Sequence, residues 1–166
     1  DHHDEEEHID HGGLILAEFV QADAEFTGYE LEIGRRIELP KGLLVLSLAR
    51  DEVDADFDGG GNVPRIVPAR TMFTARYSLD TFSARFVVKD VERQSRVALG
   101  ETVTAGFTLL NADASWSHDF GDAATLTLTA YARNLTDEKA RNHSSFVKDA
   151  VPLPGRNLGI RARLTF

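Results

Sequence analysis

The chain has 166 residues, no cysteine and a formal net charge of −9. This length is enough for one domain with a sizeable core, and the lack of cysteine excludes a disulfide scaffold or a thiolate metal site. The acidic balance argues against a nucleic-acid partner, and no apolar run approaches the roughly 18 residues that a membrane-spanning helix needs.

The first eleven residues are unusually rich in histidine and carboxylate. Imidazole together with carboxylate suits zinc, and also nickel or copper, in a loop that can fold round the ion. The candidate ligands are His2, His3, His8, His11, Asp4 and Asp10. Because no fixed ligand spacing is visible, an acidic, solvated loop that binds nothing specifically is the alternative. The charged residues 1–10 also exclude a signal peptide at this end, so we expect an exported chain to start inside a longer precursor.

We divide the chain into a His/acid-rich loop, residues 1–12, and a strand region, residues 13–166. The first predicted strand runs from about residue 14 to residue 37, with a kink at Gly28. The second covers residues 43–50 and is apolar on both sides at its start. Five further strands are predicted at residues 72–79, 82–89, 110–117, 125–133 and 157–166. Residues 103–109 alternate in the opposite phase to residues 110–117, which predicts a bulge or loop residues joining that strand.

Short and long connections alternate along the chain. Tight-turn compositions occur at residues 39–42, 79–81 and 119–122, and longer polar stretches cover residues 51–66, 90–102 and 136–155. Short turns at one end and long loops at the other are typical of an outer-membrane β-barrel. The acidic run at residues 51–58 falls on the first long stretch, where we expect a solvated loop.

The closing strand shows the alternation of side chains most clearly. Leu158, Ile160, Ala162, Leu164 and Phe166 occupy one side, and Asn157, Gly159, Arg161, Arg163 and Thr165 occupy the other. A half-buried soluble sheet would permit this pattern, as would a membrane barrel with lipid on one face and a hydrated lumen on the other. The apolar end at Phe166 favours the barrel.

Aromatic residues gather near the predicted short turns. Tyr77, Phe82, Trp116 and Phe166 all point to the apolar side, as expected for a belt at a membrane interface. An aromatic core in a soluble β-sandwich is the alternative.

The remaining polar residues suggest no enzyme. No nucleophile, acid and base share a catalytic spacing. His118, beside a short turn, and His143, in the last long loop, are predicted to be surface histidines, with His143 the better candidate for an additional metal ligand.

Four segments resemble the carboxy-terminal part of TonB-dependent outer-membrane receptors. The run Tyr131–Lys139 is similar to the end of the family's penultimate strand, although Thr136 stands where an aromatic is commoner, and Leu153–Arg156 resembles the Pro-Gly-Arg that opens the last strand. Upstream, Ala24–Glu32 resembles a Gly-aliphatic-Glu strand and Val67–Arg70 a proline-containing loop exit.

The resemblance implies an all-β fold: seven strands of a larger antiparallel, up-and-down transmembrane barrel of 22 strands. It also implies a multi-pass protein of the outer membrane, in contact with lipid, with a plug absent from this chain and with the energy-transducing TonB complex. Seven antiparallel strands leave two open edges, which are costly in lipid, so the remaining strands must come from elsewhere. The expected function is metal import, with zinc as the transported ligand and no cofactor. An iron complex such as a siderophore or haem is the first alternative, and a soluble, secreted β-domain that binds metal or a partner is the second.

Overall fold

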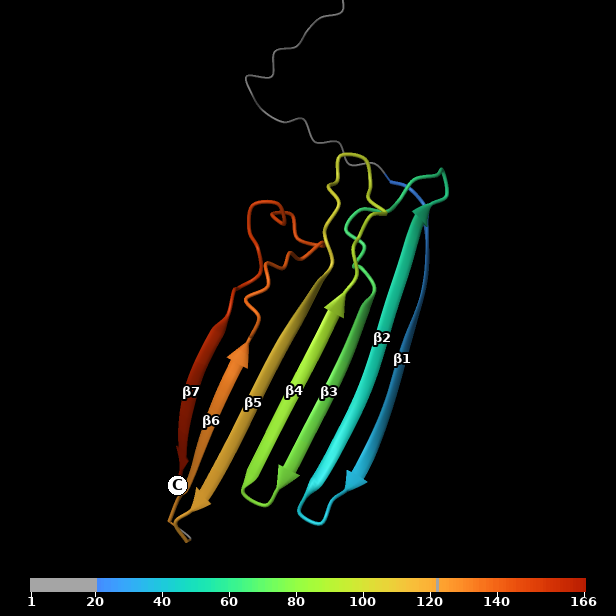
Figure 1. Ribbon diagram of the computed structural model, residues 1–166. Coiled ribbons are helices and arrows are strands. Elements are labelled where there is room, and N and C mark those ends of the chain that lie inside the picture. Colours follow the sequence, from blue (N-terminus) through green and yellow to red (C-terminus); the bar gives the residue numbers. More distant parts are fainter. Residues whose placement is uncertain (1–20, 122) are drawn as a thin grey trace, which may run out of the picture.

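A computed structural model describes residues 21–121 and 123–166, which form one antiparallel sheet of seven strands (Figure 1). The strands are β1 (Ala24–Glu38), β2 (Leu43–Phe57), β3 (Arg70–Leu79), β4 (Phe82–Val91), β5 (Phe107–Asp119), β6 (Thr125–Arg133) and β7 (Asn157–Thr165). Each strand pairs with the next one in sequence, so the sheet is an up-and-down meander with β1 and β7 at its edges. The predicted all-β class, strand number and topology are confirmed.

The connections separate by length to the two ends of the sheet. Short turns join β1 to β2, β3 to β4 and β5 to β6 at one end, and three long loops lie at the other (Figure 1). We refer to the long connections as the β2–β3 loop (residues 58–69), the β4–β5 loop (92–106) and the β6–β7 loop (134–156). Within the described residues, no helix is long and apolar enough to cross a membrane.

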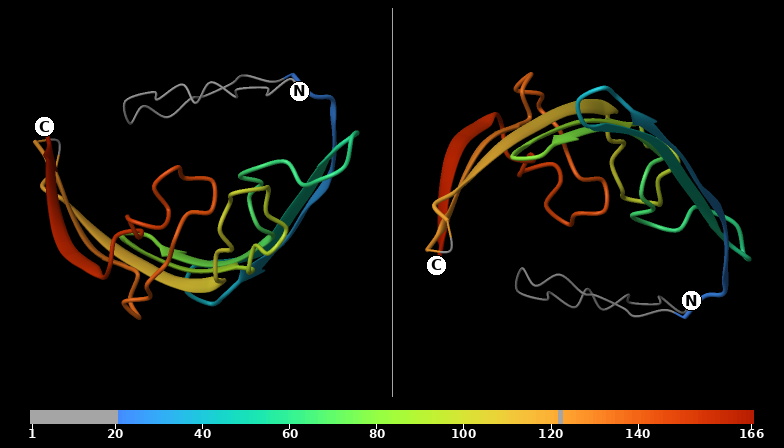
Figure 2. Two further views of the ribbon diagram at one scale, coloured as in Figure 1. Left: turned by 90° about the horizontal axis from the view of Figure 1, so that it is seen from above. Right: turned by 90° about the horizontal axis from the view of Figure 1, so that it is seen from below.

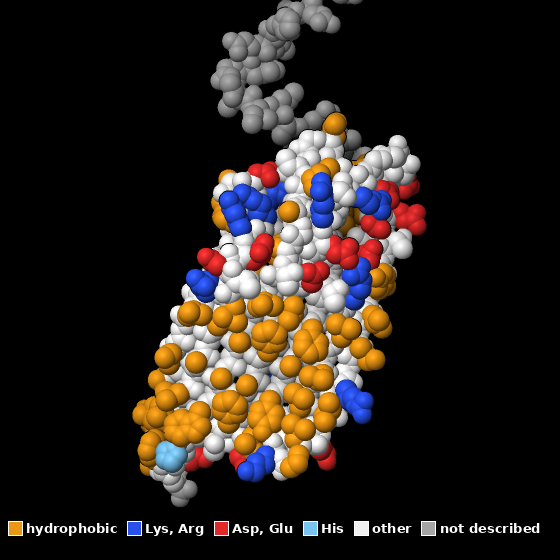
Figure 3. Space-filling model, viewed as in Figure 1, with side chains coloured by type: hydrophobic (Ala, Val, Ile, Leu, Met, Phe, Trp, Pro, Cys, Tyr) orange, Lys and Arg blue, Asp and Glu red, His pale blue; other side chains and the backbone are white. Residues whose placement is uncertain are grey.

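The sheet is curved and its two faces differ in polarity. Seen along the strands, it forms an open arc with the long loops leaning over the concave side (Figure 2). The continuous register places Leu46, Ala75, Phe86 and Ala112 in one row on the convex face. Figure 3 shows a broad band of apolar side chains on this face, with charged side chains gathered above it and a few at the lower end of the sheet. One basic residue, Arg35 at the β1 edge, lies opposite Leu46 and therefore on the same face. Alternate residues such as Arg76, opposite Arg85, therefore lie on the concave face.

Arg50 marks the border between the apolar band and the charged region. Its guanidinium group donates hydrogen bonds to the Tyr29 hydroxyl at 2.9 Å and the Thr71 hydroxyl at 3.1 Å. It also forms ion pairs with Glu52 at 3.0 Å and Glu92 at 2.8 Å. Three neighbouring strands thus change from apolar to polar at the same height.

Aromatic side chains form the other border of the apolar band, at the short-turn end. The rings of Tyr77 and Phe82 are 6.4 Å apart, and Trp116 stacks on His118 with 5.6 Å between ring centroids. His118 in turn meets the Phe120 ring edge-on at 4.8 Å. His118 is therefore part of the aromatic belt.

Three details of the predicted strands were wrong. β2 continues to Phe57, so most of the predicted acidic loop is strand, paired with β1 beyond the apolar band, where solvent permits charge. β5 begins at Phe107 and pairs with β4 without a bulge, so residues 107–109 are regular strand and the predicted strand start at residue 110 was too late; of the two alternatives for residues 103–109, loop residues hold for 103–106. Gly28 lies in an uninterrupted ladder, where a Cβ atom would come 2.7 Å from the Glu52 carbonyl oxygen. Its small size is needed for that close approach.

Candidate functional site

The six predicted metal ligands, His2, His3, His8, His11, Asp4 and Asp10, lie outside the described residues, and so does the division between residues 12 and 13. Within residues 21–121 and 123–166, no group of three or more His, Asp or Glu side chains could hold a metal ion. The chain enters β1 from the long-loop end, where the Asp58 N–H donates to the Asp23 carbonyl at 3.0 Å. The described part of the chain therefore begins at the long-loop end of the sheet.

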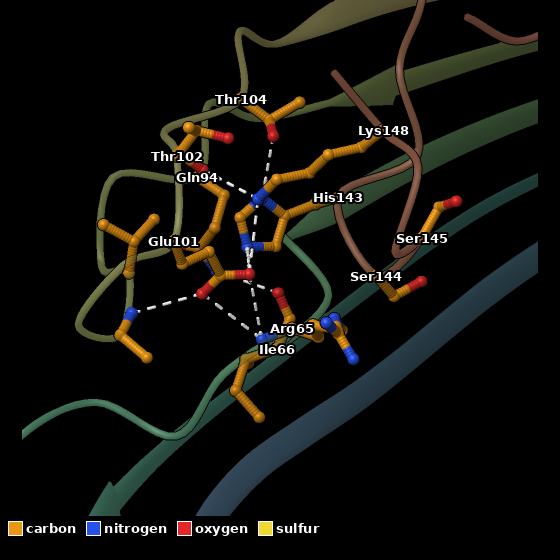
Figure 4. Close-up of polar contacts among 12 residues, drawn as sticks. Arg65, Ile66, Gln94, Glu101, Thr102, Thr104, His143, Ser144, Ser145 and Lys148 are labelled. Carbon is orange, nitrogen blue, oxygen red and sulfur yellow. Dashed lines mark hydrogen bonds and ion pairs between the residues drawn. The ribbon is translucent and has the colours of Figure 1, made fainter. Parts of the chain in front are cut away.

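Glu101 is the centre of a polar cluster that joins the three long loops (Figure 4). Its carboxylate accepts hydrogen bonds from the backbone N–H groups of Arg65 in the β2–β3 loop and Ala98 in its own loop, both at 3.1 Å. Lys148 of the β6–β7 loop lies 3.3 Å from the same carboxylate and donates to the Thr102 carbonyl at 2.7 Å. One carboxylate thus ties together segments 36 and 47 residues apart in sequence.

His143 lies inside this cluster and is buried, with 1% of its surface exposed, so its prediction as a surface histidine was wrong. Its Nδ1 atom is 2.8 Å from the Thr104 hydroxyl and 3.2 Å from the Lys148 ammonium. Since the ammonium can only donate, Nδ1 is an acceptor, and the proton of the neutral ring is on Nε2. Nε2 lies 3.1 Å from a Glu101 oxygen, but at an angle that does not make a hydrogen bond.

The cluster shifts the pKa of both titratable groups at its centre. Burial lowers the pKa of His143 below its usual range, and the Lys148 ammonium lowers it further against the opposing effects of Glu101 and Asp149. Burial alone would raise the pKa of Glu101, but the Ala98 N–H, Lys148 and His143 together hold it below its usual range. Glu101 is therefore ionised and His143 is neutral near pH 7. The ion pair inside the cluster is the one between the Glu101 carboxylate and the Lys148 ammonium.

Further contacts connect the loops around this cluster. The Gln94 side chain donates to the Ile66 carbonyl at 3.2 Å, and the Thr102 hydroxyl donates to Asp149 at 2.8 Å. The Arg65 guanidinium group lies 3.0 Å above the centre of the Phe146 ring. We refer to the three loops, joined in this way, as the loop cap.

A second polar group fixes the base of the β6–β7 loop. Asn134 has a positive φ of 48°, and its side-chain amide donates to the carbonyls of Glu138 at 2.9 Å and Pro154 at 3.2 Å while its oxygen accepts from the Glu138 N–H at 2.8 Å. Asp137 accepts a hydrogen bond from the Arg156 N–H at 2.7 Å. These residues belong to Tyr131–Lys139 and Leu153–Arg156, the two carboxy-terminal segments that resemble the receptor family. Their hydrogen bonds join the beginning of the β6–β7 loop to its end.

Basic residues dominate the concave face below the cap. Asp113 holds two of them, Arg85 at 2.9 Å and Arg133 at 2.7 Å. The register places further basic side chains on this face, namely Arg70, Arg76, Lys89, Arg161 and Arg163. From β3 to β7, therefore, the concave face is positively charged, although the chain as a whole is acidic.

A pocket of about 360 Å³ lies between this face and the loop cap. Arg70 and Lys89 line it from the sheet, and Arg141, Asn142 and Ser144 line it from the β6–β7 loop. His143 also contributes to the wall, so the pocket and the Glu101 cluster share a residue. This pocket could not be predicted from the sequence, since its polar residues come from distant segments without a common spacing.

Comparison with known proteins supports the fold. No protein-family model matches the chain, and no curated protein matches it. Among solved structures, the chain is similar to the copper transporter OprC, with a TM-score of 0.68 and 21% sequence identity over 85% of this chain. The match covers 23% of the OprC chain, so this chain spans less than a quarter of that protein's length.

Proposed function

We propose that this chain is the carboxy-terminal part of a TonB-dependent outer-membrane receptor that imports a metal, most simply zinc. The observation that carries the proposal is the curved sheet with an apolar convex face and a charged concave face. Lipid on one side and water on the other account for both faces at once. The similarity to a copper transporter supports transport of a metal rather than an enzymatic reaction.

The dimensions of the apolar band support insertion into a membrane. β3 and β4 each have 10 residues, and a tilted transmembrane strand needs about 9–11. Exposed apolar residues continue to both edges, where Ile33 in β1 is 65% exposed and Ile160 in β7 is 81% exposed. Unpaired backbone groups at these edges would cost several kcal/mol each in lipid, so we propose that further strands close the barrel.

Zinc is proposed because imidazole and carboxylate groups are concentrated in residues 1–11 of the sequence. An iron complex is the second candidate, and the positive concave face favours it, because such complexes are commonly anionic and a bare cation would be repelled. A soluble metal-binding domain is the third, and the large apolar convex face argues against it.

A growth experiment separates the two metals. We expect deletion of the receptor gene to slow growth under zinc chelation and not under iron chelation, and the full-length gene to restore it. Replacing His2, His3, His8 and His11 by alanine should abolish the rescue, whereas His118→Ala, in the aromatic belt, should retain it. A defect confined to iron limitation would contradict the zinc assignment, and extraction of the protein without detergent would contradict the receptor.

A further inference from the structure

The pocket beneath the loop cap carries a positive charge that its own walls do not neutralise. Arg70 is compensated, because its guanidinium group forms an ion pair with Asp51 at 2.8 Å. Lys89 and Arg141 have no acidic partner within 4.0 Å among the residues that the structure describes. Two cations thus face the same space of about 360 Å³ with no anion between them.

The two cations are held in different ways, and together they can converge on one ligand. Lys89 comes from β4, where it lies opposite Met72 and Leu109 on the concave face. Arg141 comes from the β6–β7 loop, and one of its nitrogens donates to the Lys148 carbonyl. Since a guanidinium group has five N–H donors, the others stay available for a ligand.

The neighbouring groups favour a small oxyanion. Asn142 and Ser144 are on the same wall, and the Ser144 hydroxyl donates to the Asn142 side-chain oxygen at 2.9 Å, which directs the amide donors of Asn142 away from that contact. An arginine fork, an ammonium group and an amide are the donors that proteins use for carboxylate and phosphate. None of the described residues that line the pocket is acidic, so a bare metal cation would find there only the nearby Asp51 carboxylate, which is already paired with Arg70.

We infer that this pocket binds an oxyanion, a carboxylate or a phosphate, that belongs to the imported metal complex. This inference rests on the proposed function and adds the chemical class of the cargo: the metal crosses the cap as an anionic chelate. Zinc and iron are both compatible with it, because the pocket recognises the chelator.

The test uses the full-length receptor in detergent and titration calorimetry with citrate, iron(III) citrate, inorganic phosphate and zinc chloride. We expect the Lys89→Gln/Arg141→Gln double variant to bind citrate and iron(III) citrate at least about tenfold more weakly than the wild type, because two charge-assisted contacts are lost. Binding in the wild type should also weaken with salt. The affinity for zinc chloride should not fall.

Two further variants serve as controls. Arg161→Gln removes a concave-face charge on β7 outside the pocket and should leave citrate binding unchanged, and Lys89→Arg/Arg141→Lys should restore most of it. The phosphate titration shows whether one oxyanion group is sufficient or a polycarboxylate is required. Equal citrate affinity in the wild type and the double variant would overturn the inference, even if metal-dependent growth persists. Charge-dependent citrate binding without any growth defect would instead contradict the import function alone.

Discussion

At the scale of single residues, His143 makes the loop cap sensitive to pH. Its pKa is lower in the closed cap than the usual value of about 6.5, so an open cap binds the proton more tightly. The stabilisation of the loop cap by neutral His143 is therefore complete above about pH 6.5 and is lost as the pH falls below it. Glu101, whose pKa is lowered, stays ionised through this window.

We expect hydrogen-exchange protection factors in the β4–β5 and β6–β7 loops to fall between pH 7.5 and 5.5, by at most about tenfold per pH unit below 6.5 for one proton. His143→Gln should remove this pH dependence. Glu101→Gln should instead lower protection at every pH, because it leaves the buried Lys148 without its carboxylate. We expect the free energy of opening the loops to fall by about 3 kcal/mol. A wild-type profile that is flat across this range would contradict the role of His143.

At the scale of elements, Asn134 holds the β6–β7 loop closed, and its replacement tests the loop base. Asn134→Ala removes three hydrogen bonds from a residue that is only 4% exposed and puts alanine at a positive φ. We expect the free energy of unfolding to fall by about 2–3 kcal/mol. The measurement is the urea midpoint of the receptor refolded in liposomes. Asn142→Ala is the matched control in the same loop, since Asn142 is exposed and its side chain accepts a hydrogen bond from Ser144 alone among the described residues. An equal loss there would show that the loop base has no special role.

The strands could be predicted from the sequence because a two-residue period is a local signal, and the residues of the apolar convex face preserve it. Prediction failed where that constraint ends: β2 keeps its pairing through Asp51, Glu52 and Asp54 beyond the apolar band, and composition alone placed those acids in a loop. The loop cap could not be predicted, because Glu101 meets Arg65 and Lys148 across 36 and 47 residues. The carboxy-terminal motif, in contrast, was visible, since Asn134 and Glu138 contact each other within one turn.

At the scale of the whole molecule, the charge of the chain is divided by location. The acids of β2 meet cations at the loop end, as in the pairs of Arg96 with Asp54 at 2.8 Å and with Asp56 at 2.7 Å. The free positive charge lies on the concave face instead. The acidic residues of β2 are thus concentrated at the loop end of the sheet, and the unpaired basic residues of β3 to β7 are on the concave face. The net charge of −9 does not reveal this separation.

The assignment of the convex face to lipid can be tested with two adjacent valines. Val88 lies on the convex face between Phe73 and Leu110, and Val87 lies on the concave face between Thr74 and Asn111. Arginine on a lipid-facing site costs about 2 kcal/mol when it is below the membrane surface and little in a hydrated lumen. We therefore expect Val88→Arg to lower the free energy of unfolding of the receptor in liposomes by about that amount and Val87→Arg to change it by less than about 0.5 kcal/mol. Because the two variants share residue type, strand and height, the difference between them isolates the solvent on each face. A larger loss for Val87→Arg would mean that the concave face is the dry one and would favour a soluble domain over the receptor. Equal losses would contradict the assignment of lipid to the convex face.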